Sequence, residues 1–249
     1  MVAALLIGES DPVDLWNGDG QSRCVLICEH ASNLLPRRLG TLGLPKSELE
    51  RHIAWDIGAA EVARRLARLL DAPLVLQRYS RLVYDCNRPP DSPDAMPEIS
   101  ETTSIPGNQG LSSAEKLERT VEIYRPFHAA VTQLLDRRAA TGVRSLVVSI
   151  HSFTPVYNGM GRSVELGILH DRDTRLAARL ITSFRDVDAR LNEPYGPKDG
   201  VLHTLDLHAA PRGLLHAMIE VRNDLVSTEG GQAEWAQRLS DPLIQAAKH

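Results

Sequence analysis

Three residues that could hold a metal ion stand at the ends of predicted secondary-structure elements. His30 and His151 each close a short apolar run, and Asp56 directly precedes an amphipathic segment. Two imidazoles and a carboxylate are a common ligand set of catalytic zinc and leave a fourth position for water. A histidine at a strand end can equally be a hydrogen-bonded structural residue. The residues alone therefore leave a metal site and a structural cluster both open.

A further candidate is Glu220, a carboxylate inside the apolar run 217–221. Burying an unpaired carboxylate in such a strand costs several kcal/mol. Glu220 therefore either pairs with an arginine such as Arg222 or acts as a general base beside an activated water. The strand alone does not separate these two interpretations.

The segment 81–88 combines cations with amide and carboxylate groups. Arg81 and Arg88 flank Asp85 and Asn87 where a predicted strand passes into a loop. Two guanidinium groups and an amide at one such junction suit bidentate capture of an acidic substrate. An ordinary ion pair between Arg88 and Asp85 is the alternative.

The elements that must position these residues alternate between strands and helices. Apolar runs predict strands at 24–28, 73–77, 82–84, 145–150, 163–169 and 217–221. Helical periodicity predicts helices at 57–70, at 112–138, at about 174–185 and at about 234–247. Pro126 is expected to kink the second of these helices. The proline-rich segment 87–106 predicts a long irregular loop that could form the rim of a site. This alternation indicates an α/β fold, namely a three-layer α/β/α sandwich with a mainly parallel mixed sheet. We expect a single domain over residues 1–249, in which residues 1–21 form an N-terminal extension.

The composition excludes several classes of protein. With 28 Lys and Arg against 32 Asp and Glu and no basic block, binding to nucleic acid is disfavoured. Three cysteines are too few for a disulfide framework and favour a reduced, cytoplasmic protein. The apolar run 2–7 is too short for a signal peptide, and no stretch approaches the roughly twenty apolar residues of a membrane span.

Six blocks together resemble the N-formylglutamate amidohydrolase family. They are CEHASN at 28–33, HIAWDIGA at 52–59, SRLVYDCNRPP at 80–90, IPGN at 105–108, HSFTP at 151–155 and IEVRNDL at 219–225. The blocks follow the family's order over residues 22 to 226. The resemblance implies a phosphorylase/hydrolase-like fold, related to zinc carboxypeptidases (zinc-dependent exopeptidases) and aspartoacylases.

The resemblance also implies roles for individual residues. One Zn²⁺ per chain is expected on His30, Asp56 and His151, with Glu220 as the general base. Arg81 is expected to stabilise the oxyanion. The related carboxypeptidases use a His-x-x-Glu motif, but Asn33 stands at the glutamate position here. Asn is a poor zinc ligand, so Asp56 is the expected carboxylate ligand, with Glu29 as the alternative.

The implied substrate is a small acidic N-acyl amino acid, N-formyl-L-glutamate or a similar compound, as in amino-acid catabolism. The residues expected to bind it are Arg81, Asn87, Arg88 and Arg222. A zinc amidase or peptidase acting on another small substrate fits the same residues. A metal-free binding protein for an acidic ligand is the non-enzymatic alternative, in which the histidines serve structure only.

Overall fold

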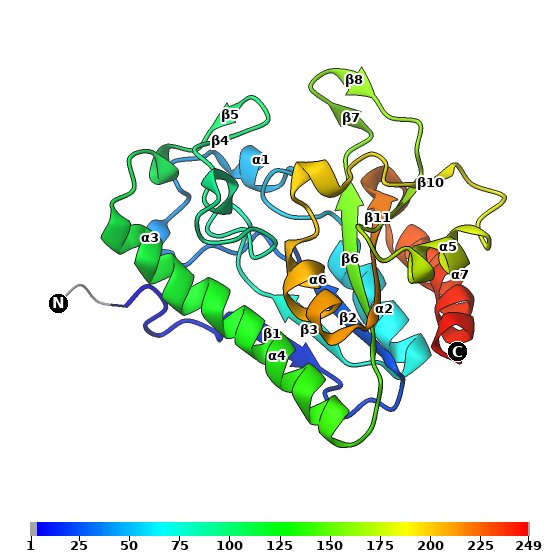
Figure 1. Cartoon of the computed structure of the whole chain (residues 1–249). Helices are drawn as coiled ribbons and strands as arrows, with labels where there is room; N and C mark the ends of the chain where they lie inside the picture. The colour runs from blue at the N-terminus through cyan, green and yellow to red at the C-terminus, as the bar shows by residue number, and fades with distance from the viewer. Residues whose placement is uncertain (1–3, 249) are drawn as a thin grey trace.

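A seven-stranded mixed sheet runs through the centre of the computed structural model, which describes residues 4–248 (Figure 1). The strands, in spatial order, are β1 (Val13–Trp16), β3 (Leu74–Gln77), β2 (Cys24–Cys28), β6 (Leu146–Phe153), β11 (Leu215–Arg222), β9 (Leu166–Leu169) and β10 (Ala189–Leu191). The neighbours β3, β2, β6 and β11 are parallel, whereas β1 and β9 pair antiparallel with β3 and β11. Part of the expected N-terminal extension therefore belongs to the sheet, while residues 2 and 3 of the apolar run 2–7 lie outside the described residues.

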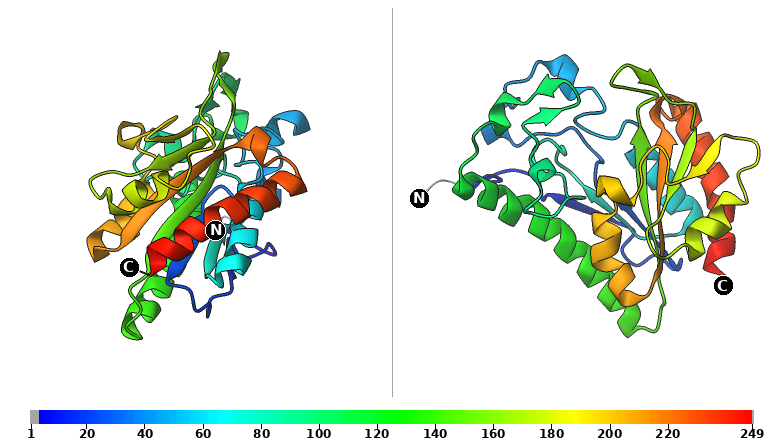
Figure 2. Two further views of the ribbon diagram at one scale, coloured as in Figure 1. Left: turned by 90° about the vertical axis from the view of Figure 1, so that its right-hand side faces the viewer. Right: turned by 45° about the horizontal axis from the view of Figure 1, so that its top comes forward.

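Helices cover both faces of the sheet, because the strands are apolar on both sides. In β2, Leu26 packs into one core with the helices α2 (Ala59–Leu70), α5 (Arg175–Ile181) and α7 (Glu229–Ala247). Val25 and Ile27 point to the opposite core, beneath α4 (Arg125–Ala140) and α6 (His203–His208). Helices α2 and α7 lie side by side in Figure 2. The predicted three-layer α/β/α arrangement is confirmed.

Residues 82–84 do not form the predicted strand. Leu82, Val83 and Tyr84 are buried, but they lie in a turn that Ser80 closes. The Ser80 hydroxyl accepts a hydrogen bond from the Leu82 backbone N at 3.1 Å, and its carbonyl accepts one from the Val83 N at 2.9 Å. The strand predicted from the apolar residues 82–84 is therefore wrong, and these residues follow a turn that the Ser80 side chain stabilises.

The long helix predicted at 112–138 is present in three parts. It comprises α3 (Ser113–Arg119), a π-helical segment (Thr120–Tyr124) and α4. Ser112 and Glu115 form a capping box: the Ser112 Oγ accepts from the Glu115 N, and the Glu115 carboxylate accepts from the Ser112 N at 2.9 Å. The π-helical turns end just before Pro126, which has no amide hydrogen to donate.

Two hairpins project beyond one edge of the sheet (Figure 1). The first lies in the segment predicted as an irregular loop and joins β4 (Ile99–Ser100) to β5 (Thr103–Ser104). The second follows β6 and joins β7 (Val156–Tyr157) to β8 (Met160–Gly161). The Glu101 Oε1 accepts a hydrogen bond from the Asn158 backbone N at 3.2 Å, so the tips of the hairpins touch. A short helix, α1 (Lys46–Leu49), precedes the loop that leads to Asp56.

Within residues 4–248, no helix has both the length and the apolar character needed to cross a membrane. Cys24, Cys28 and Cys86 are buried, free thiols.

Candidate metal centre and active site

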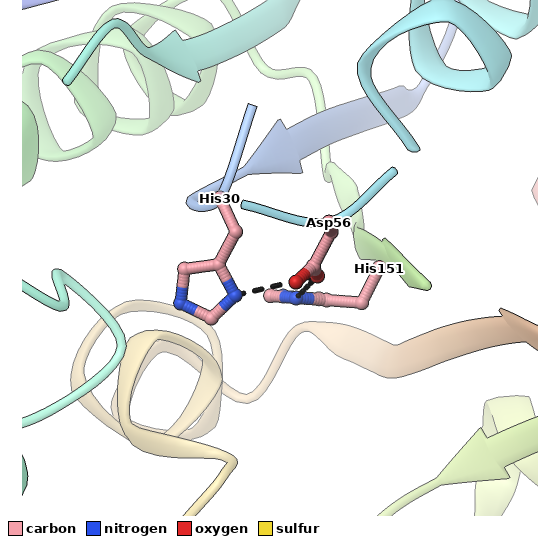
Figure 3. Close-up of side chains that lie close together, drawn as sticks. All are labelled: His30, Asp56 and His151. Carbon is pink, nitrogen blue, oxygen red and sulfur yellow. Dashed lines mark hydrogen bonds and ion pairs between the residues drawn. The ribbon is translucent and has the colours of Figure 1, made fainter. Parts of the chain in front are cut away.

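His30, Asp56 and His151 meet at the edge of the sheet where the parallel strands end. His30 follows β2, His151 lies in the last part of β6, and Asp56 comes shortly before α2. The Asp56 Oδ2 lies 2.7 Å from the His151 Nδ1 and 3.3 Å from the His30 Nδ1 (Figure 3). One ligand atom from each residue falls within 4.8 Å of the others. Side chains at the carboxyl ends of parallel strands form the usual ligand site of an α/β sheet.

Two further carboxylates hold the outer nitrogen of each imidazole. The His30 Nε2 lies 2.7 Å from the Asp85 Oδ1, and the His151 Nε2 lies 3.0 Å from the Glu29 Oε2. Metal-binding histidines commonly use one nitrogen for the ion and hydrogen-bond the other to a carboxylate. Both Nδ1 atoms here face the shared Asp56 carboxylate, so the three donors fit a divalent metal such as zinc.

The charges of this cluster favour a cation at its centre. All five residues are at most 3% exposed. Burial raises the pKa of Glu29, but His151 and a hydrogen bond from Ser149 outweigh burial and lower this pKa to about 2. Burial likewise lowers the pKa of His151, and the carboxylates of Glu29 and Asp56 reverse the effect and raise it well above its ordinary value. The buried carboxylates are thus balanced either by protonated imidazoles or by a bound metal ion.

Glu220 lies beside His151, because the two residues are register partners on β11 and β6. Its Oε2 is buried and has no hydrogen-bond partner among the described residues. Burial raises the pKa of Glu220 to about 7, against the opposing effect of His151. The salt bridge to Arg222 that the sequence left open does not form. The Arg222 guanidinium donates instead to Asp224 at 2.8 Å and to the Ser163 carbonyl at 3.0 Å, and it does not line the cavity described next.

A cavity of about 470 Å³ opens above these groups. Its base contains the three candidate metal ligands and Glu220, and both hairpins contribute to its walls. The walls include Arg81, Asn87, Arg88, Glu101, Tyr157, Arg162 and Tyr195. Its size and polar lining suit a small charged molecule.

The side chains of the segment 81–88 lie partly beside the candidate metal ligands and partly in the wall of the cavity. Arg81 donates to the Asp85 Oδ2 at 2.7 Å and lies 3.6 Å from the Asp56 Oδ1. Asp85 therefore pairs with Arg81, not with Arg88, and it supports His30 rather than standing free for a ligand. The Asn87 side chain binds the segment 201–204, donating to the Val201 carbonyl and accepting from the Thr204 N.

Some residues of the cavity carry no signal in the sequence. Tyr157 lies in β7, Arg162 directly follows β8, and Tyr195 lies in the loop after β10. They lie far from the strand ends that marked the other candidates, and irregular segments have no periodicity from which side-chain direction could be predicted. Glu29, the alternative carboxylate ligand, lies with its Oε2 3.0 Å from the His151 Nε2.

These observations define an α/β protein with a buried His-Asp-His group, suited to a metal ion, beneath a polar cavity. The chain belongs to the N-formylglutamate amidohydrolase family, whose sequence model matches residues 22–227. Membership of this family makes the protein an amidohydrolase. Among curated protein sequences, none matches the chain significantly.

Solved structures resemble the chain over most of its length. A gene product from Agrobacterium tumefaciens shares 48% identity and a TM-score of 0.95, with 99% of this chain and 100% of that chain covered. An N-formylglutamate amidohydrolase from Ralstonia eutropha has 17% identity and a TM-score of 0.70, and the alignment covers 96% of this chain and 98% of that chain. An aspartoacylase family protein from Mesorhizobium loti has 16% identity and a TM-score of 0.37, and the alignment covers 91% of this chain and 60% of that chain.

Proposed function

We propose that this protein is a zinc-dependent hydrolase that removes the formyl group from N-formyl-L-glutamate or a closely similar N-acyl amino acid. The observation that carries the proposal is the unpartnered, buried Glu220 carboxylate beside the His-Asp-His group. A carboxylate kept without a partner next to a metal site is suited to accept a proton from water.

His30, Asp56 and His151 are the residues that would hold one zinc ion per chain. Bound zinc supplies Lewis acidity toward the amide carbonyl and the attacking water. Asp85 and Glu29 keep the two imidazole rings in place through their Nε2 atoms, so the Nδ1 atoms stay directed at Asp56.

Glu220 moves the proton in this scheme. Its carboxylate takes a proton from water while the water oxygen forms a bond to the formyl carbon. The same proton then passes to the amide nitrogen as the carbon–nitrogen bond breaks, giving formate and the free amino acid. A pKa near neutrality suits a group that must both take and return a proton.

Arginines bind the anionic parts of the substrate. Arg81 lies at the cavity with a side chain 29% exposed and supplies positive charge toward the carbonyl oxygen. The Arg88 guanidinium donates to the Gly200 and Asn87 carbonyls and forms no ion pair within the described residues, which leaves its charge for a substrate carboxylate. Asn87 holds the neighbouring segment 201–204 in place. Arg222, tied to Asp224, stabilises the end of β11.

The proposal is tested by metal content and product release. Purified protein is loaded with zinc and given N-formyl-L-glutamate, N-acetyl-L-glutamate or a dipeptide. The released amine is measured for all three substrates, and formate is measured for the formyl substrate. We expect one zinc per chain, with formate release lost on chelation and restored by zinc. His151→Ala should lose both zinc and turnover, whereas Arg179→Gln, an exposed position on α5, should lose neither. Full turnover without metal would refute the zinc chemistry, and hydrolysis of the acetyl or peptide substrate alone would reassign the substrate.

A further inference from the structure

Two of the three arginines that line the cavity have no carboxylate partner among the described residues. Arg81 forms ion pairs with Asp85 at 2.7 Å and with Asp56 at 3.6 Å. Arg88 and Arg162 form no ion pair within residues 4–248, although both lie at a cavity and are only partly exposed. A partly buried cation gains most from a counter-ion, so both positions are suited to a ligand anion.

Arg162 is held by aromatic rings rather than by acids. Its Cζ lies 4.5 Å from the centre of the Tyr157 ring and 4.7 Å from that of Tyr195. Among residues 4–248, only its Nη1 donates hydrogen bonds, to the Tyr195 hydroxyl at 2.9 Å and more weakly to the Thr154 carbonyl at 3.5 Å. Contact with the two rings restricts the guanidinium while its remaining N–H groups stay available for a carboxylate.

The acidic residues that share this cavity wall are engaged elsewhere. Glu101 lies 2.7 Å from the Arg51 Nη2 and 3.3 Å from the His52 Nε2. The Asp199 Oδ2 accepts a hydrogen bond from the Gly196 N at 2.8 Å. Neither carboxylate neutralises Arg162, so the protein leaves this charge for something that enters the cavity.

We propose that Arg162 determines specificity by binding the side-chain carboxylate of a dicarboxylic N-acyl amino acid. This proposal rests on the proposed function, and it adds a residue for the second anionic group. A dicarboxylate has one carboxylate for Arg88 and one for Arg162. The rings of Tyr157 and Tyr195 beside Arg162 provide apolar surface for the methylene groups that lead to the side-chain carboxylate.

The test compares N-formyl-L-glutamate with N-formyl-L-glutamine, which has the same shape but a neutral side chain. The wild-type protein should prefer the glutamate derivative, and Arg162→Gln should raise its KM about 10- to 100-fold, the size of a lost charge-assisted pair. The KM for the glutamine derivative should change by less than about threefold, because only the carboxylate contact is lost. Arg162→Lys keeps the charge without the planar fork and should give an intermediate preference. Arg179→Gln on α5 is the matched control.

A structural role for Arg162 predicts a different result. If Arg162 only supports the hairpin, Arg162→Gln and Arg162→Lys should impair both substrates equally, and that outcome would overturn the proposal. Calorimetric binding of glutarate and of its half-amide to the zinc-loaded protein needs no turnover. Glutarate should bind the wild type at least tenfold more tightly than the half-amide, with the difference lost in Arg162→Gln. If neither formyl substrate is cleaved, the proposed function fails, and the glutarate comparison still decides the role of Arg162.

Discussion

Replacing Asp85 by Asn separates two roles that this residue could have. Asp85 belongs to the segment 81–88, whose arginines and amide suit capture of an acidic substrate, whereas the structure places the Asp85 carboxylate beside the candidate metal ligand His30. Its Oδ1 lies 2.7 Å from the His30 Nε2 and also accepts from the Asn87 N at 2.9 Å, while its Oδ2 accepts from Arg81 at 2.7 Å. An amide at this position keeps one acceptor and presents N–H groups to Arg81, which has only donors.

The loss of zinc affinity expected for Asp85→Asn follows from these contacts. Outer carboxylates of metal-binding histidines contribute about 10- to 100-fold in metal affinity, or roughly 1.4 to 2.7 kcal/mol. Asp85→Asn should weaken zinc binding by that amount, because the His30 ring loses the charge that orients it and raises its basicity. With saturating zinc, the KM for N-formyl-L-glutamate should change by less than about threefold.

The assay is competition for zinc against a chromophoric chelator, followed by steady-state kinetics at saturating zinc. Asp136→Asn is a suitable control, because Asp136 also pairs with an arginine, Arg212, but lies outside the cavity. Unchanged zinc affinity in Asp85→Asn, together with a KM raised tenfold or more, would refute the orienting role and support direct contact with the substrate.

Three further predictions concern stability and the rim of the cavity. Burial lowers the pKa of His128 to about 3 and that of His208 to about 4, so the unfolded chain binds more protons below pH 6.5 and stability falls as the pH drops toward 4. His208→Asn should reduce the slope of the unfolding free energy between pH 5 and 6 by up to about 1.4 kcal/mol per pH unit in urea titrations, and an equal slope would contradict this. Ser112→Ala removes the helix cap and should cost about 1 kcal/mol of unfolding free energy, whereas Ser112→Asp, which can still cap, should restore most of it. Glu101→Gln weakens the contact between the two hairpins and should speed amide hydrogen exchange at the tip of the β7–β8 hairpin. Amide exchange as slow as in the wild type would show that this contact does not stabilise the hairpins.

The main elements of the fold could be predicted from local pattern because their causes are local. Continuous apolar runs such as residues 24–28 require burial on both faces, and that burial requires helices on either side. The short edge strand β1 lacked such a run, and the Ser80 turn depended on side-chain hydrogen bonds that an apolar pattern does not reveal.

The candidate site was predictable to a similar extent. His30 and His151 come at the ends of predicted parallel strands, and the rule that such strands place their carboxyl ends together predicts that these two residues meet. Asp56 precedes a helix, so its position beside them depends on the fold of the loop that leads to it. Their role as zinc ligands stays a prediction. The direction of a long side chain is a tertiary property, so the pairing of Arg222 with Asp224 and the position of Arg162 could not be predicted from spacing.

Glu220 is the residue that we propose transfers the proton in a zinc-dependent hydrolysis. Its most direct test is Glu220→Gln, which keeps the shape of the side chain and removes its ability to take a proton. Formate release and zinc content are measured on the same zinc-loaded preparation. We expect one zinc per chain and a kcat at least about 100-fold lower than that of the wild type, in keeping with the usual contribution of a general base. A Glu220→Gln protein that retains zinc and turns over at close to the wild-type rate would contradict the account.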